Sequence, residues 1–481
     1  MTRHFRGLSS RLAFLWKGNV MLNDIISSKA SLFADGVQTV LRGHENRNRR
    51  VSIQKGNLVT NTRMQMRGIS ARVTKDGVHG FASVSGYSVQ DAEAVLKSAT
   101  ENAMFLFRHN GGRSALPPAY SCGTIPLNRE IIDTEQKIII DTCREIDNYI
   151  VKKYPDLTSR TVVYTEDSQD KIIVSSDCSS GHVTNPRCYI YVFLNSETKD
   201  GIPVELFDVC GSGGDFRSNF SDLTPVCNMI DALYLKLMDK KEGVFPEAGY
   251  KTVVLGNKMT GMLSHEAVGH TVEADLVKGG SVAGPNLGKQ VASELVSLVD
   301  FANTAFGKTV PLPIYLDDEG IKAEDAVLIE NGVLKDFMHD RESALLFGKK
   351  PCGNARAWEY QDEPLIRMRN TCILPGKDSI EDMISSIDDG YYLTESGNGQ
   401  ADLTGEFMFG VNMGYEIKNG KLGRALLDTT VSGVAFDMLK TVDMISSDIM
   451  WVSSGFCGKK QMIPVSMGGP QLRCKIMIGG R

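Results

Sequence analysis

Short runs of alternating apolar and polar residues, separated by turns that contain glycine, extend through most of this chain. In the first half, VSIQKGNLVT and GISARVTKDGVHGFASV contain Lys-Gly and Asp-Gly pairs. In the second half, AVLIENGVLKDFMHD and EFMFGVNMGYEIKNGKLGRALL contain Asn-Gly pairs. Alternation with a period of two is typical of strands with one buried face, and such pairs are typical of tight hairpins. The pattern predicts antiparallel strands in both halves, and an antiparallel sheet or barrel in the second.

Several helices interrupt these strands, so the predicted class is α+β. The clearest begins at Ser88, where Ser88 and Asp91 have the spacing of a capping box and apolar residues follow at helical spacing as far as Phe107. A late helix is predicted from Ser379 to Asp389, with Gly390 as its C-cap. The remaining predicted helices cover residues 133–154, 231–240 and 258–278.

A chain of 481 residues is long enough for two or three domains. The charged, Gly- and Pro-containing segment 241–250 predicts a linker. It separates a mixed α/β domain at residues 21–240 from a β-rich domain at residues 251–481. Residues 1–20 are expected to be a disordered extension, or to precede a true start at Met21, because their apolar run is too short for a signal peptide.

Composition narrows the classes of partner. The formal net charge of -5 excludes a nucleic-acid binder driven by overall charge, and we expect the basic stretch from Arg42 to Arg50 to be a solvated hairpin tip. Residues 210–216, CGSGGDF, do not form the dinucleotide-binding fingerprint. No apolar stretch has the length of a membrane span. The ten cysteines are scattered without a C-x-x-C pair, which predicts reduced thiols and a cytoplasmic protein.

The stretch LSHEAVGH, residues 263–270, differs from a zinc-protease helix by one residue. In H-E-x-x-H, two histidines four apart share a helix face and the glutamate acts as a general base. His265 and His270 are five apart, so a regular α-helix would point them about 140° away from each other. A π-helical turn would return both to one face, and Gly269 offers the backbone freedom for it. Spacing alone leaves a metal site and two ordinary helix histidines both open.

A catalytic zinc ion also needs a third protein ligand and an open position. Glu273 and any of the ten cysteines are candidates. Cys457 is distinctive because SGFCGKK places it between glycines with lysines nearby, where a thiolate is favoured. Its alternative interpretation is a small buried apolar residue. His339 and the Asp317-Asp318 pair receive no role.

The motif LSHEAVGHTVEAD, the segment PLIRMRNTCILPGKDSIEDMI, the Gly-rich ESGNGQADLTGEFMFGVNMGYEIKNGK and the ending GFCGKKQMIPVSMGGPQLRCKIMIGG occur in this order. Together they resemble the TldD/PmbA family of zinc metallopeptidases from about Met21 onward. The resemblance implies that His265, His270 and Cys457 bind zinc and that Glu266 is the general base on the zinc-bound water. Because the H-E-x-x-x-H motif is intact, the chain resembles the TldD-like subunit rather than the partner that has lost it.

The resemblance also implies a peptidase that acts on unfolded or extended peptides, as a homodimer or as a heterodimer with a homologue that lacks the motif. The competing interpretation is a non-catalytic peptide-binding or scaffold subunit with a structural zinc, completed by a fourth ligand such as Glu273. Glu266 beside the first histidine argues against it, because a structural site has no use for a base. The sequence does not distinguish endopeptidase from exopeptidase activity.

Overall fold

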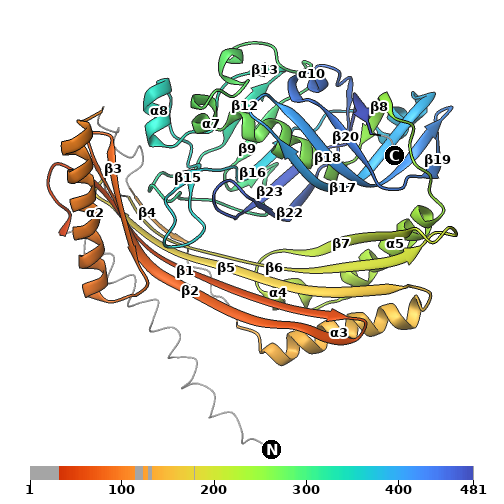
Figure 1. Ribbon diagram of the computed structural model, residues 1–481, viewed down its shortest axis with the longest axis horizontal. Coiled ribbons are helices and arrows are strands. Elements are labelled where there is room, and N and C mark those ends of the chain that lie inside the picture. The colour runs from red at the N-terminus through yellow and green to blue at the C-terminus, as the bar shows by residue number, and fades with distance from the viewer. Residues whose placement is uncertain (1–31, 114–122, 128–132, 178, 480–481) are drawn as a thin grey trace, which may run out of the picture.

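The computed structural model describes residues 32–113, 123–127, 133–177 and 179–479. A long, curved N-terminal sheet forms one layer, and a β-rich C-terminal domain lies against one of its faces (Figure 1). The predicted extension at residues 1–20 and the alternative start at Met21 lie outside the described residues. The predicted α+β class, with mixed N-terminal and β-rich C-terminal parts, is confirmed.

The N-terminal sheet has the order β3-β2-β1-β5-β6, with β4 and β7 both pairing with β6. All of its pairings are antiparallel except that of β4 with β6. The predicted hairpin turns are confirmed at Lys55-Gly56 and Asp76-Gly77, where all four residues have positive φ. The strands are β1 (Gln38–Gln54), β2 (Asn57–Lys75), β3 (Val78–Val84), β4 (Gly123–Leu127), β5 (Ser159–Ser175), β6 (Ser179–Glu197) and β7 (Pro203–Gly213).

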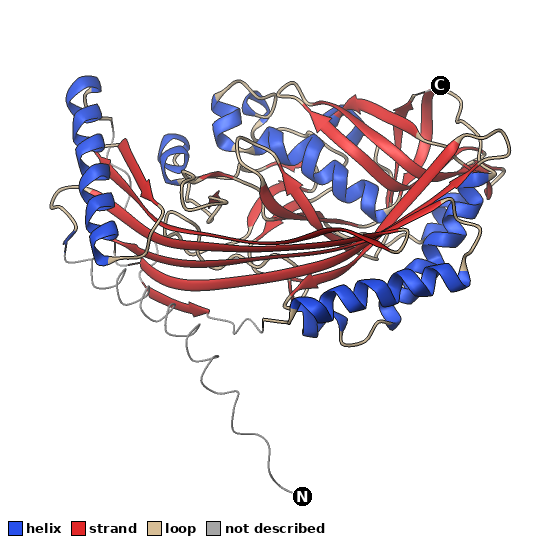
Figure 2. Cartoon of the chain, turned by 60° about the horizontal axis from the view of Figure 1, so that its bottom comes forward, coloured by secondary structure: helices blue, strands red, loops and turns tan. Residues whose placement is uncertain are grey.

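Helices cover the two ends of this sheet (Figure 2). At one end α2 (Val89–Asn110) packs on β2 and β3, and its predicted capping box between Ser88 and Asp91 is present. At the other end α3 (Gln136–Lys153) packs on β5, while α5 (Thr224–Lys241) packs on β7 after the short α4 (Phe216–Phe220). The predicted helix at 231–240 therefore begins earlier, at Thr224. None of the helices in the described part of the chain has the length and apolar character needed to cross a bilayer.

Two predictions for this sheet are wrong. The basic stretch from Arg42 to Arg50 is not a hairpin tip but the middle of β1, where Arg42 and Arg49 are buried. The polar run at residues 167–170, Asp-Ser-Gln-Asp, predicts a turn between two strands, but it continues β5 without a break. Both polar stretches lie on strands covered by other parts of the chain, and Arg42 contacts Asp318 of the C-terminal domain at 2.9 Å. Burial with a charged partner is what allows these residues to be central in a sheet.

In the C-terminal domain, strands β17, β8, β24, β20 and β18 form a ring that the pairing of β17 with β18 closes into a barrel. The predicted sheet or barrel is thus a barrel here, with β19 and β21 attached to β18 and β24. The segment predicted as a linker connects α5 to β8. The strands are β8 (Gly249–Leu255), β17 (Asp389–Ala401), β18 (Glu406–Lys418), β19 (Lys421–Ala425), β20 (Thr429–Val434), β21 (Met444–Ile445) and β24 (Leu472–Ile478).

A six-stranded sheet packs beside the barrel in the order β13-β12-β9-β16-β23-β22. Its strands are β9 (Leu298–Phe301), β12 (Ala326–Glu330), β13 (Val333–Leu334), β16 (Asn370–Ile373), β22 (Met450–Cys457) and β23 (Ile463–Gly469). Two short hairpins, β10 (Thr304–Ala305) with β11 (Lys308–Thr309) and β14 (Ala355–Arg356) with β15 (Leu365–Ile366), and the helices α8 (Arg341–Phe347) and α10 (Ala435–Leu439) complete the domain.

The predicted late helix is shorter than expected. Helix α9 (Ile380–Ser385) begins after Ser379, whose side chain caps it, but ends well before Gly390. Gly390 lies instead in β17, where a Cβ atom would be 2.2 Å from the carbonyl oxygen of Thr252 on β8. The glycine is therefore required by the close approach of two barrel strands, not by a helix end.

The predicted helix at 258–278 is a buried, interrupted segment between the barrel and the six-stranded sheet. It consists of α6 (Asn257–Met262), a π-helical turn (Leu263–Gly269), a 3₁₀ turn (His270–Val272) and α7 (Ala274–Lys278). The apolar side chains of this segment join the largest hydrophobic cluster among the described residues, together with residues of both sheets. This packing fixes the histidine motif from two sides.

Candidate metal centre

The histidine motif forms a π-helical turn, the conformation that brings histidines five residues apart to one face. The backbone N–H of His270 donates to the carbonyl of His265, five residues earlier. The two imidazole rings consequently lie on the same side, with centroids 5.2 Å apart and planes at 77°. An α-helical turn would have directed them apart.

Gly269 is needed in this turn for a different reason from the predicted one. Its φ of -54° and ψ of -47° are ordinary helical values, so no special backbone freedom is used. A Cβ atom at this position would instead lie 2.1 Å from Sδ of the buried Met368. Gly269 thus permits close packing of the motif against the segment that precedes β16.

Cys457, at the end of β22, lies next to the histidine pair. Its Sγ is 3.3 Å from Nε2 of His270. One ligand atom from each of His265, His270 and Cys457 lies within 4.8 Å of the others. Zinc–nitrogen and zinc–sulfur bonds of about 2.0–2.3 Å place tetrahedral ligands roughly 3.3–3.8 Å apart. The trio is therefore close to the size of a zinc site.

The electrostatics of the trio favour a thiolate. Burial alone raises the pKa of Cys457, but hydrogen bonds and positive charge from His265 and His270 lower it to about 4. Burial lowers the pKa of His270, whereas the charge of Glu273 and the contact with Cys457 raise it to about 10. A metal ion would bind the thiolate and the neutral form of the imidazole. The positive charge of the metal would then take the place of the imidazolium charge beside the thiolate. One thiolate and two imidazoles are a donor set that suits zinc.

Glu266 lies in the same π-helical turn, on the accessible side of the trio. Its Oε2 is 3.8 Å from Nε2 of His270, and 23% of its side chain is exposed. By contrast, 1% of His265 and 5% of Cys457 is exposed. Glu266 and His270, whose side chain is 20% exposed, are therefore the groups of the motif that water or a substrate can reach.

Glu273 does not face the trio. Its Oε2 is 2.9 Å from Nδ1 of His270, the ring nitrogen that faces away from Cys457, so the carboxylate lies behind the imidazole. Lys459 contacts the same carboxylate oxygen at 3.3 Å. The buried Arg367 donates to the carbonyl oxygens of Cys457 and Lys459 and so holds the turn after β22. The sequence indicated Lys459 only as one of the lysines near Cys457 that favour a thiolate, and it gave no role to Arg367.

The other residues considered from the sequence lie outside the trio. Asp317, Asp318 and His339 are buried, and Asp318 pairs with Arg42 and Lys171 of the N-terminal sheet. They are interior residues rather than members of the metal centre.

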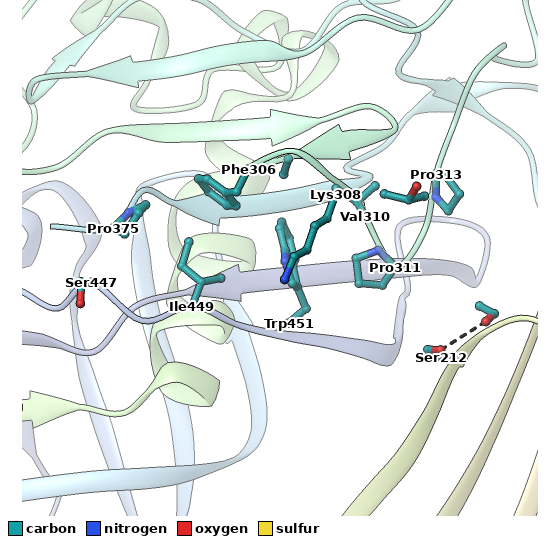
Figure 3. Close-up of a pocket in the computed structure, with 13 residues that line it drawn as sticks. Ser212, Phe306, Lys308, Val310, Pro311, Pro313, Pro375, Ser447, Ile449 and Trp451 are labelled. Carbon is teal, nitrogen blue, oxygen red and sulfur yellow. Dashed lines mark hydrogen bonds between the residues drawn. The ribbon is translucent and has the colours of Figure 1, made fainter. Parts of the chain in front are cut away.

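A cavity of about 760 Å³ lies between the end of β7 and the C-terminal domain (Figure 3). Phe306, Lys308, Pro311 and Trp451 are among its lining residues, and no residue of the trio lines it. Trp451 and Cys457 are on the same strand, and residues 451 to 457 span roughly 20 Å of extended chain. The cavity is therefore separate from the candidate metal centre.

Comparison with known proteins is consistent with this geometry. Residues 248–480 match the PmbA/TldA metallopeptidase C-terminal domain, and residues 40–103 match PmbA/TldA metallopeptidase domain 1. The zinc metalloprotease TldD homolog of Saccharolobus solfataricus is 30% identical over 359 residues, which cover 74% of this chain and 79% of that protein. The metalloprotease TldD homolog of Haemophilus influenzae is 31% identical over 441 residues, 86% of this chain and 87% of that protein.

Solved structures share the fold. TldE from Thermococcus kodakarensis superimposes with a TM-score of 0.75 at 17% identity, covering 96% of this chain and 100% of that one. A putative modulator of a DNA gyrase from Thermotoga maritima gives a TM-score of 0.74 at 19% identity, with coverage of 96% and 99%. These similarities concern the fold, whereas the sequence matches extend over the motif-bearing domain. The chain belongs to the PmbA/TldD family of metallopeptidases.

Proposed function

We propose that this chain is a zinc-dependent peptidase in which His265, His270 and Cys457 hold the metal and Glu266 is the general base. The observation that supports this most directly is the convergence of one ligand atom from each of the three residues within 4.8 Å. Glu266 is partly exposed beside them, at 3.8 Å from His270.

When bound, zinc supplies a Lewis acid that acidifies water and polarises a peptide carbonyl. Glu266 would accept the water proton on its carboxylate and return it to the departing amine. The buried thiolate of Cys457 lowers the positive charge of the centre relative to a site made of three histidines. The hydrophobic core packs against the apolar side chains of the π-helical turn, Leu263, Ala267 and Val268, and so holds this turn in place.

Extended, unfolded peptides are the proposed substrates, because such chains can pair their backbone with a sheet edge with little regard to side chains. Strand β22, which ends at Cys457, is the outer strand of its sheet. The carbonyl oxygens of Ser453 and Ser454 accept hydrogen bonds from Arg187, Tyr189 and Tyr191 of the N-terminal sheet. The N-terminal sheet thus covers the middle of β22, so a substrate chain would pair with the end of this strand, where Phe456 is exposed beside Cys457.

A second chain of the same fold is the proposed partner, either another copy or a homologue without the motif. The support for the heterodimer is that TldE from Thermococcus kodakarensis has the same fold as this chain. We also propose a cytoplasmic location. The eight cysteines that the structure describes are free, as expected in a reducing compartment.

The alternative, a binding subunit with a structural zinc, needs a closed set of four protein ligands. Glu273, the candidate fourth ligand, contacts the far nitrogen of His270 instead. Within the described residues the ligand group has three members. A three-ligand set with an adjacent carboxylate fits a catalytic site better.

Metal removal and restoration would test the proposal. The purified chain would be stripped with a chelator, assayed on an unfolded casein, and assayed again after stoichiometric zinc is added. Loss and return of cleavage would support the peptidase. Cleavage that persists in the zinc-free protein would contradict it, and zinc binding without cleavage would favour the structural-zinc alternative or a missing partner subunit.

A further inference from the structure

The backbone holds the carboxylate of Glu273 behind the candidate metal centre. The 3₁₀ turn that carries His270 ends at Glu273, whose φ of -77° and ψ of 121° are extended. Backbone hydrogen bonds join Met338 to Val272 and to Ala274 on either side of it. The position of Glu273 is thus fixed by pairing with another segment, and the side chain is fully buried.

This carboxylate determines which nitrogen of His270 carries a proton. Glu273 Oε2 lies 2.9 Å from Nδ1, while Cys457 Sγ lies 3.3 Å from Nε2 of the same ring. A carboxylate can only accept, so Nδ1 must donate to it. In the neutral imidazole the lone pair is then on Nε2, the nitrogen that faces the other ligand atoms.

Lys459 connects this carboxylate to the turn that carries the thiolate. Its Nζ is 3.3 Å from Glu273, 2.7 Å from Asp275 and 3.0 Å from the carbonyl oxygen of Ile366. Lys459 follows Cys457 by two residues, so one ammonium group links the imidazole side of the centre to its thiolate side. It also provides the positive partner that a fully buried carboxylate requires.

We infer that Glu273 and Lys459 are positioning residues for the metal centre. Glu273 orients His270 and fixes its tautomer. Lys459 fixes the position of the Glu273 carboxylate relative to the turn that follows Cys457. The inference rests on the proposed function, because it assumes that His270 and Cys457 bind the metal. Both residues lie outside the trio of His265, His270 and Cys457.

Zinc affinity, measured by competition with a chromophoric chelator, separates this role from a general structural one. Glu273→Gln keeps the shape but removes the charge, and Lys459→Met keeps the length of the side chain. Asp275→Asn is the matched control for the carboxylate, because Asp275 contacts Lys459 and has no contact with the imidazole. Lys460→Met is the control for the lysine, because Lys460 is the next residue and is exposed.

We expect Glu273→Gln to bind zinc about 10- to 100-fold more weakly, as is usual when the partner of a metal-bound histidine is lost. Lys459→Met should shift affinity in the same direction, while both controls stay within about fivefold. In the cobalt-substituted protein, Glu273→Gln should alter the d–d absorption and retain the thiolate-to-metal band, because Cys457 still binds. A cooperative thermal unfolding transition, measured in the presence of chelator, would show that each variant folds. If Glu273→Gln does not fold, Glu273→Asp would take its place.

Wild-type zinc affinity in Glu273→Gln, or equal losses in Glu273→Gln and Asp275→Asn, would overturn the inference. Failure of the proposed function would look different. A wild-type protein that binds zinc but cleaves no peptide would contradict the peptidase, and the affinities would still decide the role of Glu273. A wild-type protein that binds no zinc would contradict both.

Discussion

Sγ of Cys457 lies 3.3 Å from Nε2 of His270, although 187 positions separate the two residues in the chain. One comes from the last residue of an edge strand and the other from a turn packed between barrel and sheet. The fold of the C-terminal domain therefore assembles the candidate metal centre, which no local segment contains by itself.

Replacement of this cysteine should abolish stable zinc binding. Cys457→Ala removes the only thiolate of the trio, and the two remaining imidazoles are too few for a protein zinc site. Zinc content after gel filtration, measured by atomic emission, should fall from about one ion per chain to near zero. Cys372→Ala is the control, because this buried cysteine lies in another core cluster and should leave the zinc content unchanged. Full zinc in Cys457→Ala would show that Cys457 is not a ligand.

A methyl group at Gly269 should destabilise the protein. Its Cβ would be 2.1 Å from Sδ of Met368, so either that side chain or the π-helical turn must move. Gly269→Ala should lower the free energy of unfolding by about 1–3 kcal/mol, as overpacking of a core does. Gly455→Ala is the control, since its Cβ would meet only Met467 Cε at 3.4 Å.

Denaturant unfolding of the single variants and of Gly269→Ala combined with Met368→Ala would test this explanation. The double variant should lose less stability than the sum of the two single losses, because the second change makes room for the first. Strictly additive losses would mean that the clash with Met368 is not the cause.

Asp318 should stabilise the folded chain in a pH-dependent way. Although burial raises its pKa, the charges of Lys171 and Arg42 hold the pKa of Asp318 well below its usual range. An aspartate in the unfolded chain has a pKa of about 3.9. Because the folded value is lower, the stabilisation is fully present above about pH 5 and is lost as pH falls toward the folded-state pKa.

Asp318→Asn would leave two buried cations without this partner and should cost about 3–5 kcal/mol at pH 7. The difference from wild type, measured by urea unfolding, should shrink as pH falls below about 4. Asp443→Asn, which breaks an exposed pair with Arg473, should change stability by less than about 1 kcal/mol. A difference for Asp318→Asn that is small at pH 7, or that grows in acid, would contradict the assignment.

Folded proteins should resist cleavage while the same chains are cut when unfolded. The N-terminal sheet already occupies carbonyl oxygens of β22 through Arg187, Tyr189 and Tyr191, so only an extended chain should reach the end of this strand. A disulfide-bonded protein, compared before and after reduction and alkylation, provides the two states of one sequence. Equal rates on both states would remove the proposed preference.

Local signals in the sequence predicted local structure well. Lys55-Gly56 forms a hairpin turn because both residues have positive φ, a requirement that is visible in the residue pair itself. The capping box of Ser88 and Asp91 is equally local. The five-residue spacing of His265 and His270 left a π-helical turn and a regular helix both open, and the structure has the π-helical turn.

Long-range contacts account for what the sequence did not reveal. Arg42 looked like a surface residue because its buried partner, Asp318, is 276 positions away. Gly390 looked like a helix cap because its close neighbour on β8 is not visible in the sequence. Likewise, the contact of Lys459 with Glu273 depends on two segments that only the folded domain brings together.

Glu266→Gln is the sharpest test of the proposal that Glu266 is the base at a zinc centre, because the change removes the proton acceptor without removing a ligand. The measurement is the initial rate of cleavage of an unfolded casein by wild type and by Glu266→Gln, each loaded with zinc and verified to carry equal zinc per chain. We expect the variant to bind zinc like wild type and to lose at least about 100-fold in rate, as for the loss of a general base. A zinc-loaded Glu266→Gln protein that cleaves at the wild-type rate would contradict the account.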